Sequence, residues 1–238
     1  MFRLTMLLVL VMGILLSGCV PTTITGSGNV VARDEAITGF DKVAISHSFE
    51  VNVIQGEDFS VIIRLDDNLI EHLRVVKEGS TLKIGLNPNR NYTVRDATME
   101  AEVIMPQLAG LDLSGSSHAM ISGFKSAADL STDLSASSSL QGDIEVGNIN
   151  IDMASSSEMK LNGSGDDATI DVSSSSELDL SEFTVVNARV NATSSSSATV
   201  NVSGRLDVDA SSSASVYYLG NPTLGEIDTS SSASVEPK

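Results

Sequence analysis

The chain has 238 residues, of which 31 are acidic and 14 are basic, and its formal net charge is −17 at pH 7. A surface this acidic repels nucleic acid, which excludes nucleic-acid binding as a function. The single cysteine excludes an internal disulfide, so packing and backbone hydrogen bonds must hold the fold. Apolar residues make up 41% of the chain and alternate regularly, which argues against disorder.

Residues 1–18 have the pattern of a secretory signal peptide. Arg3 supplies a positive charge, and the apolar run Leu4–Leu16 is too short to span a bilayer as a helix. The tetrapeptide that ends at Cys19 resembles the bacterial lipobox, in which the cysteine is acylated. We therefore expect an envelope lipoprotein that is attached to a membrane through Cys19 and faces the periplasm or the cell exterior, with residues 19–28 as a linker. The alternative is an ordinary cleaved signal peptide with an accidental cysteine.

Residues 29–110 are predicted to form an N-terminal β-rich cap. Within them, residues 43–56 match the repeat described next and are interpreted as a degenerate first coil. A short helix is expected after Asp67 and Asn68, because these residue types favour helix starts. Strands are expected at Phe59–Leu65, Thr81–Leu86 and Met99–Met105, the last ended by Pro106.

Residues 111–238 consist of seven serine-rich copies of one sequence unit. Each copy contains an acidic or Asn residue that serves as its origin, and the steps between successive origins average about 19 residues. A repeat of this length that aligns throughout indicates a solenoid and not low-complexity sequence. The seven origins are Asp112, Asp133, Asp152, Asp171, Asn191, Asp207 and Glu226.

Apolar residues occupy alternate positions in every copy, which is the pattern of β-strands with one buried face. A unit with two or three short strands cannot bury that face alone, whereas stacked copies bury a continuous core. Connections between parallel strands are strongly right-handed. The predicted fold is therefore all-β: a right-handed parallel β-helix, or β-solenoid, with about 19 residues per coil and the cap at its N-terminal end.

Two adjacent serine columns run through all seven copies. Alternation predicts that the second column points inward at a narrow corner, where each hydroxyl bonds backbone groups of a turn. Hydroxyls one strand spacing apart are expected to be too distant to bond each other. A catalytic serine is not indicated, since a nucleophile is needed once and these serines recur. The predicted inward column is Ser117, Ser138, Ser157, Ser176, Ser196, Ser212 and Ser231.

The origin column is acidic in six of seven copies, and alternation points it outward. Carboxylates about 5 Å apart repel each other, so they either splay into solvent or share a bridging cation. The best candidates for Ca²⁺ ligands are Asp133, Asp152 and Asp171, although no EF-hand loop is present. The solvated arrangement is the simpler interpretation, and we expect no cofactor.

Several segments together resemble a known family, the head GIN domain of putative auto-transporter adhesins. The resemblance covers roughly residues 26–235 and implies a right-handed β-helix with an adhesin-like role and no catalytic residues. The segments are ITGFDKVAISHSFEVNVIQG from Ile37, DDNLIEHLRVVKEGSTLKIGL from Asp66, VIMPQLAGLDLSGSS from Val103, and the serine repeats that follow.

Two function classes are open on the sequence alone. We favour a non-enzymatic surface module or scaffold that binds a glycan or another envelope protein. The alternative is a β-helix that binds or cleaves polysaccharide, but the basic residues of the repeats are scattered and tryptophan is absent. The last copy ends near Val235 and is followed by a charged tail with Pro237. We therefore expect the C-terminal coil either to form a weak homodimer or to stay monomeric.

Overall fold

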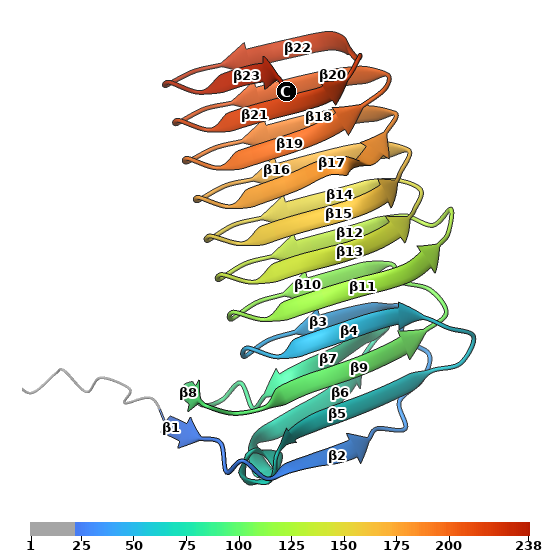
Figure 1. The fold of residues 1–238 in the computed structure, drawn as a ribbon, viewed down its shortest axis with the longest axis vertical. Helices are drawn as coiled ribbons and strands as arrows, with labels where there is room; N and C mark the ends of the chain where they lie inside the picture. Colours follow the sequence, from blue (N-terminus) through green and yellow to red (C-terminus); the bar gives the residue numbers. More distant parts are fainter. Residues whose placement is uncertain (1–21) are drawn as a thin grey trace, which may run out of the picture.

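The computed structural model describes residues 22–238, so the predicted signal peptide and Cys19 lie outside the described residues. From residue 110 onward, each copy of the repeat supplies two strands joined by a tight serine-rich turn (Figure 1). The first strands of the copies are β10 (Gly110–Leu113), β12 (Leu130–Leu134), β14 (Ile149–Met153), β16 (Asp167–Val172), β18 (Asn187–Ala192), β20 (Arg205–Ala210) and β22 (Thr223–Thr229). The second strands are β11 (His118–Lys125), β13 (Ser139–Glu145), β15 (Glu158–Ser164), β17 (Glu177–Val185), β19 (Ser197–Val202), β21 (Ser215–Gly220) and β23 (Ser234–Pro237).

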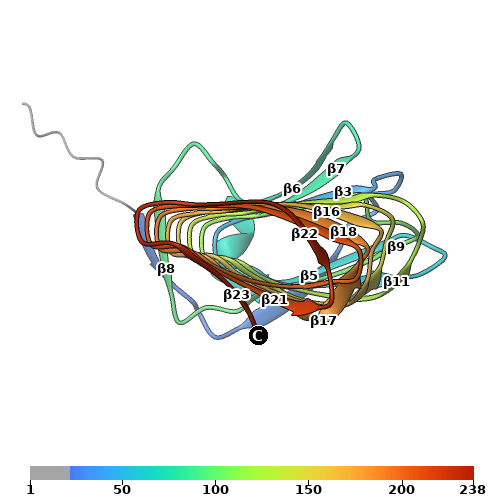
Figure 2. The ribbon, with the colours of Figure 1, turned by 90° about the horizontal axis from the view of Figure 1, so that it is seen from above.

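The two sets of strands form two sheets that face each other across the core. A ten-stranded sheet contains the first strands in the order β22-β20-β18-β16-β14-β12-β10, and an eleven-stranded sheet contains the second strands from β11 to β23. Seen from above, the coils lie over one another, and the serine-rich turns stack at one narrow edge (Figure 2). The chain climbs as a right-handed coil (Figure 1). The predicted all-β parallel solenoid is confirmed.

The first coil consists of β3 (Lys42–Ile45) and β4 (Glu50–Gln55), which pair in parallel with β10 and β11. Ile45 lies opposite Leu113, and Val51 lies opposite Ala119, which is the alignment that the sequence predicts for the degenerate copy. Phe49 stands where the later copies have their inner serine, and it is fully buried. The first coil therefore buries an aromatic ring at the corner where later coils bury a hydroxyl.

The cap, within residues 22–105, adds strands to both sheets and also contains a separate two-stranded sheet of its first strand and β8. Its elements are β1 (Thr22–Thr25), β2 (Val30–Asp34), β5 (Ser60–Asp66), the 3-10 helix η1 (Asp67–His72), β6 (Leu73–Glu78), β7 (Thr81–Leu86), β8 (Tyr92–Arg95) and β9 (Met99–Met105). The pairs β2–β5, β5–β9 and β6–β7 are antiparallel, whereas β7 joins β3 and β9 joins β4 in parallel. The antiparallel strands therefore finish both sheets at the N-terminal end.

Residues 22–28, which lie in the predicted lipid-anchored linker 19–28, contribute a strand and pack against the cap. β1 pairs in parallel with β8, and the segment that follows is held by Asp66. The Asp66 carboxylate is buried and accepts hydrogen bonds from the backbone N–H groups of Gly28 and Thr98. Asp67 accepts further hydrogen bonds from Ser27 and Asn29. This network fixes the start of the described chain against the cap.

The observed register also corrects the alignment of the last two copies. β20 places Asp209, and not Asp207, opposite Asn191, and β22 places Asp228, and not Glu226, opposite Asp209. The origins predicted for these two copies therefore lie two residues too early in the chain. The error arises because acidic and serine residues occur at the required spacing from both starting positions. Between equivalent positions the coils then contain 21, 19, 19, 20, 18 and 19 residues.

The core runs as one continuous apolar column between the sheets. Its largest fully buried side chains include Phe49 in the first coil and Phe183 in the middle of the repeats. Alternate residues of the strands face it, as in the burial of Ile149, Ile151 and Met153 along β14. Among residues 22–238, no helix is long and apolar enough to cross a membrane.

Candidate functional site

The serine-rich turns change direction through pairs of residues with left-handed backbone conformation. In the third copy these are Ser155 and Ser156, with φ values of 58° and 62°. Two consecutive left-handed residues form a type I′ turn, and each non-glycine residue in this region costs about 1–2 kcal/mol. The N–H of Ser156 donates to the carbonyl of Ser174 at 3.0 Å, so the hydrogen-bond ladder continues from coil to coil through the turns.

The inner serine follows each left-handed pair in the first five copies. Ser117, Ser138, Ser157, Ser176 and Ser196 are all at most 2% exposed. The Ser138 hydroxyl donates to the carbonyl of Leu113 at 3.1 Å, and the Ser196 hydroxyl donates to that of Val172 at 2.9 Å. These carbonyls belong to the coil below, so each hydroxyl links two coils.

Two expectations about this column are wrong. The hydroxyls of Ser157 and Ser176 do bond each other, at 3.2 Å, although they belong to neighbouring coils. Ser212 and Ser231 are not inward: they are exposed and are the first left-handed residues of their turns. The inner position of the last two copies is taken by Ala214 and Ala233, as the corrected register requires. The column is structural in its first five members.

The acidic column lies on the outer face of the ten-stranded sheet. Asp133, Asp152 and Asp171 are directly opposite one another on neighbouring strands. Burial raises the pKa of Asp152, and the charges of Asp133 and Asp171 raise it further. Asn191 donates its amide to Asp171 at 2.8 Å, which ends the run of adjacent carboxylates. Within residues 22–238, no group of three or more His, Cys, Asp or Glu side chains is placed to hold a metal ion.

Asp207 lies outside this column and is locally paired. Its carboxylate binds the Arg205 guanidinium through two contacts of 2.6 and 2.8 Å and accepts the backbone N–H of Glu226. These partners lower the pKa of Asp207 to about 2. The carboxylate that the sequence alignment took for a column member therefore stabilises the bulge between β20 and β22.

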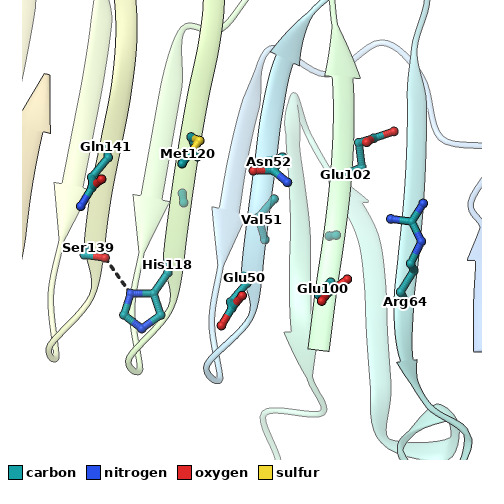
Figure 3. A pocket seen from close by; sticks show the side chains of 12 residues that line it. Glu50, Val51, Asn52, Arg64, Glu100, Glu102, His118, Met120, Ser139 and Gln141 are labelled. Atoms are coloured by element: carbon teal, nitrogen blue, oxygen red, sulfur yellow. Dashed lines mark hydrogen bonds between the residues drawn. The ribbon is translucent and has the colours of Figure 1, made fainter. Parts of the chain in front are cut away.

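A shallow groove of about 470 Å³ crosses the outer face of the eleven-stranded sheet over β5, β9, β4, β11 and β13 (Figure 3). One row across the strands contains Arg64, Glu100, Glu50, His118 and Ser139 in register. The row beside it contains Glu102, Asn52, Met120 and Gln141. The groove therefore lies where antiparallel cap strands and parallel coils share one sheet.

The groove presents chemically mixed side chains. Its carboxylates lie towards the cap with Arg64 beyond them, and its amide groups extend over the first coils (Figure 3). The His118 ring and the Ser139 hydroxyl are joined by a hydrogen bond of 2.6 Å. Met120 is 55% exposed. This surface can accept and donate hydrogen bonds and offers one apolar contact.

The sequence alone does not identify these residues as a site. The signal was present, since polar residues alternate with buried ones along Glu50–Gln55 and Met99–Met105. The pairing of β9 with β4 brings the two sets together, and strand pairing across such a distance in sequence is not visible in the alternation alone. His47 lies elsewhere, in the turn of the first coil. Its Nδ1 accepts the backbone N–H of Leu86, and burial lowers the pKa of its ring.

Solved structures with this fold have little sequence in common with the chain. A putative adhesin from Bacteroides fragilis NCTC 9343 aligns with a TM-score of 0.82 at 16% identity, over 90% of this chain and 100% of its own. A putative lipid binding protein from Parabacteroides distasonis ATCC 8503 aligns with a TM-score of 0.75 at 21% identity, over 91% and 100%. At such identities the likeness establishes the fold alone.

A third similar structure is a putative adhesin from Parabacteroides merdae ATCC 43184, with a TM-score of 0.66 at 14% identity over 91% of this chain and 99% of its own. No curated protein matches the chain. A family model does, over residues 39–222, from the loop before the first coil to the turn before β22. Because this match covers well over half of the sequence, the protein belongs to the family described as "Putative auto-transporter adhesin, head GIN domain".

Proposed function

We propose that this protein is a non-enzymatic binding module of the cell envelope that attaches to a membrane through an acylated Cys19. The observation that carries the binding role is the groove across five strands of the eleven-stranded sheet, with its amide, carboxylate and thioether side chains on a rigid surface. Membership of an adhesin family and the adhesin descriptions of similar folds support it. The partner we expect is an envelope glycan or another envelope protein.

A rigid sheet suits this role because binding then loses little conformational entropy. The coil-to-coil hydrogen bonds hold neighbouring outward side chains at the strand spacing of about 4.8 Å, so the groove is preformed. Its width over five strands allows contacts with an extended partner. The acidic ten-stranded sheet on the opposite side keeps the protein soluble and repels anionic surfaces.

The binding role can be tested with immobilised envelope glycans and envelope proteins, using a soluble form of residues 20–238. We expect the double variant Asn52→Ala, Gln141→Ala to bind more weakly than the wild type, because both amides line the groove. Asn150→Ala removes an exposed amide from β14 on the other sheet and should bind normally. Equal binding by all three proteins would contradict the groove. Polysaccharide cleavage by the same preparation would contradict a non-enzymatic module.

The anchor is tested separately by metabolic labelling with a palmitate analogue. Wild-type protein should become labelled and sediment with membranes, whereas Cys19→Ala should do neither. Label that persists in Cys19→Ala would contradict acylation at this residue. The groove experiment uses soluble protein, so its outcome is independent of the anchor.

A further inference from the structure

The start of β1 lies close to the proposed lipid anchor. β1 begins at Thr22, three residues after Cys19. Three residues of fully extended chain span about 11 Å at most. If Cys19 is acylated, as proposed above, Thr22 therefore lies within about 11 Å of the membrane surface. β1 and β8 lie beside the cap, far from β22 and β23 at the other end of the molecule (Figure 1).

The pairing of β1 with β8 brings a second segment to the same place. The two strands are parallel, and Thr22 lies opposite Tyr92. Both chains of a parallel pair enter from the same end, so the connection 87–91 that leads into β8 lies on the side of the anchor. This connection contains Arg90, and β8 ends at Arg95. Both arginine side chains are exposed.

Residues 79–95 form a basic stretch in a strongly acidic chain. They contain Lys83, Arg90 and Arg95 and no acidic residue. Lys83 forms an ion pair with Glu78 at 2.7 Å. Within the part of the chain that the structure describes, no carboxylate is at ion-pairing distance from Arg90 or Arg95. Two exposed positive charges therefore lie near the anchor without a partner in the fold.

The other side chains on this surface are mostly uncharged. Thr23 and Thr25 are exposed on β1, whereas Ile24 between them packs partly against the core. Residues 19–32 contain no charged side chain, and the first carboxylate after β8 is that of Asp96. Guanidinium groups bind phosphate through two parallel hydrogen bonds, so the arginines beside these hydroxyls suit a phosphate ligand.

The coils carry the opposite charge and extend away from this end of the molecule (Figure 1). Residues 111–238 contain 18 acidic and 5 basic residues. An anionic membrane repels such a surface over roughly one Debye length, which is about 8 Å at physiological ionic strength. A membrane contact made by the arginine side of the cap therefore also keeps the acidic coils away from the lipid.

We propose that Arg90 and Arg95 bind the phosphate groups of anionic phospholipids in the membrane to which Cys19 is attached. The proposal rests on the lipid anchor proposed above and adds a second contact, which fixes how the molecule is oriented on the membrane. One acyl chain binds only marginally, and each basic residue near an anionic surface adds about fivefold in affinity. No residue that lines the groove belongs to β1, to β8 or to the connection 87–91, so this contact leaves the groove free.

The test uses residues 19–238, in which Cys19 is the only cysteine and can be alkylated selectively with one hexadecyl chain. Partition is measured onto vesicles of phosphatidylcholine, with and without about one third of phosphatidylglycerol. Arg90→Gln, Arg95→Gln should partition about tenfold or more weakly than the wild type onto the anionic vesicles and equally onto the neutral ones. Arg90→Lys, Arg95→Lys should keep most of the wild-type partition, because phosphate also attracts an ammonium group. Hydrogen exchange of residues 87–95 should slow on the anionic vesicles only.

The matched control is Lys160→Gln, Arg189→Gln, which removes two exposed positive charges from the coils and should partition like the wild type. Equal partition of the wild type and Arg90→Gln, Arg95→Gln onto anionic vesicles would overturn the proposal. An equal loss in the control would overturn it too, because net charge and not this site would then determine binding. Since the hexadecyl chain is attached chemically, the result is separate from palmitate labelling in cells: failed labelling removes the anchor, whereas failed partition removes only the arginine contact.

Discussion

Serine has two distinct roles within each turn of the solenoid. Exposed serines adopt the left-handed conformation at the centre of the turn, and a buried serine follows them in the first five copies. The exposed positions need a backbone conformation, whereas the buried position needs a small side chain with a donor. Glycine would serve the first role with less strain, yet only Gly115 occupies such a position.

Replacing a left-handed residue by glycine should therefore stabilise the protein. Ala136 has a φ of 53° and is exposed, so Ala136→Gly should raise the free energy of unfolding by about 0.5–1 kcal/mol. Ala154 precedes the next turn without a positive φ, and Ala154→Gly should lower that free energy by about the same amount. Chemical denaturation of the two variants measures both changes. The same sign for both would show that the strain at Ala136 is absent.

The buried serine tolerates little additional volume. Ser176 is 1% exposed and accepts the backbone N–H of Ser157 at 3.2 Å. Ser176→Leu should overpack the corner and break this contact, lowering the free energy of unfolding by about 1–3 kcal/mol. Glu177→Gln, on the outer face one residue later, should have little effect. Identical thermal melting of the wild type and Ser176→Leu would contradict an inward side chain at this position.

At the scale of the strands, the ten-stranded sheet places side chains of the same charge next to one another on neighbouring strands. Parallel in-register pairing places each carboxylate of the acidic column opposite the next one, so the repeat that aligns the apolar core also aligns the charges. The repulsion lowers the stability of the sheet, but the side chains reach solvent, which weakens the repulsion. The column therefore contributes solubility at some loss of stability.

This repulsion gives a pH-dependent prediction. The pKa of Asp152 is raised in the folded protein above its ordinary value of 3.8, so its neutral form stabilises the fold. That contribution is complete below pH 3.8 and is lost as the pH rises through the raised value. Asp152→Asn should therefore increase the melting temperature at pH 7, and the increase should vanish below about pH 3.8.

The control for this experiment is Asp58→Asn, an exposed carboxylate in the connection between β4 and β5. It should leave the melting temperature nearly unchanged at pH 7. A lower melting temperature for Asp152→Asn at pH 7 would show that the carboxylates do not repel one another. A cation shared between the carboxylates would give this result.

Much of the element structure follows from the alternation in the sequence. The strands Thr81–Leu86 and Met99–Met105 have the predicted bounds, and the short helix expected after Asp67 and Asn68 is the 3-10 helix η1, which begins at Asp67. The apolar residues of each repeat alternate so regularly that only one strand register buries all of them. In the sixth copy, however, Asp207 and Asp209 both fit the acidic position, and only strand pairing distinguishes them.

The parts that could not be predicted depend on distant pairing and on backbone conformation. A run of serines does not reveal which two adopt positive φ, because all have the same side chain. The antiparallel pairing of β5 with β9 joins residues that are far apart in sequence. The groove depends on that pairing. Cys19 and the predicted signal peptide lie outside the described residues.

At the scale of the whole molecule, each coil contacts mainly its two neighbours. Stability in such a structure is close to a sum over coils and their interfaces. Deleting residues 154–172 joins Met153 to Ser173 and removes one complete coil, since Met153 and Val172 are equivalent in register. The shortened protein should remain folded, with the same circular dichroism spectrum per residue and a somewhat lower unfolding free energy.

Deleting residues 154–171 removes one residue fewer and supplies the control. Val172 then stands between the strand and its turn, which moves the turn residues out of phase and points the following side chains to the wrong face. This variant should melt at a lower temperature and less cooperatively than the in-register deletion. Equal stability of the two deletions would show that the phase of the turns is not fixed.

The position of β9 also determines when the solenoid can begin to form. β4 lies between β9 and β11 in the eleven-stranded sheet, so its edge towards the cap stays open until β9 pairs with it. Once β9 has paired with that edge, β3 and β4 can pair with further strands only on the side that faces the repeats. The serine-rich coils can then be added one at a time, in the order in which they are translated. When coils are added in this order, each new coil covers the open end of the one before it, which limits the time that apolar faces spend uncovered.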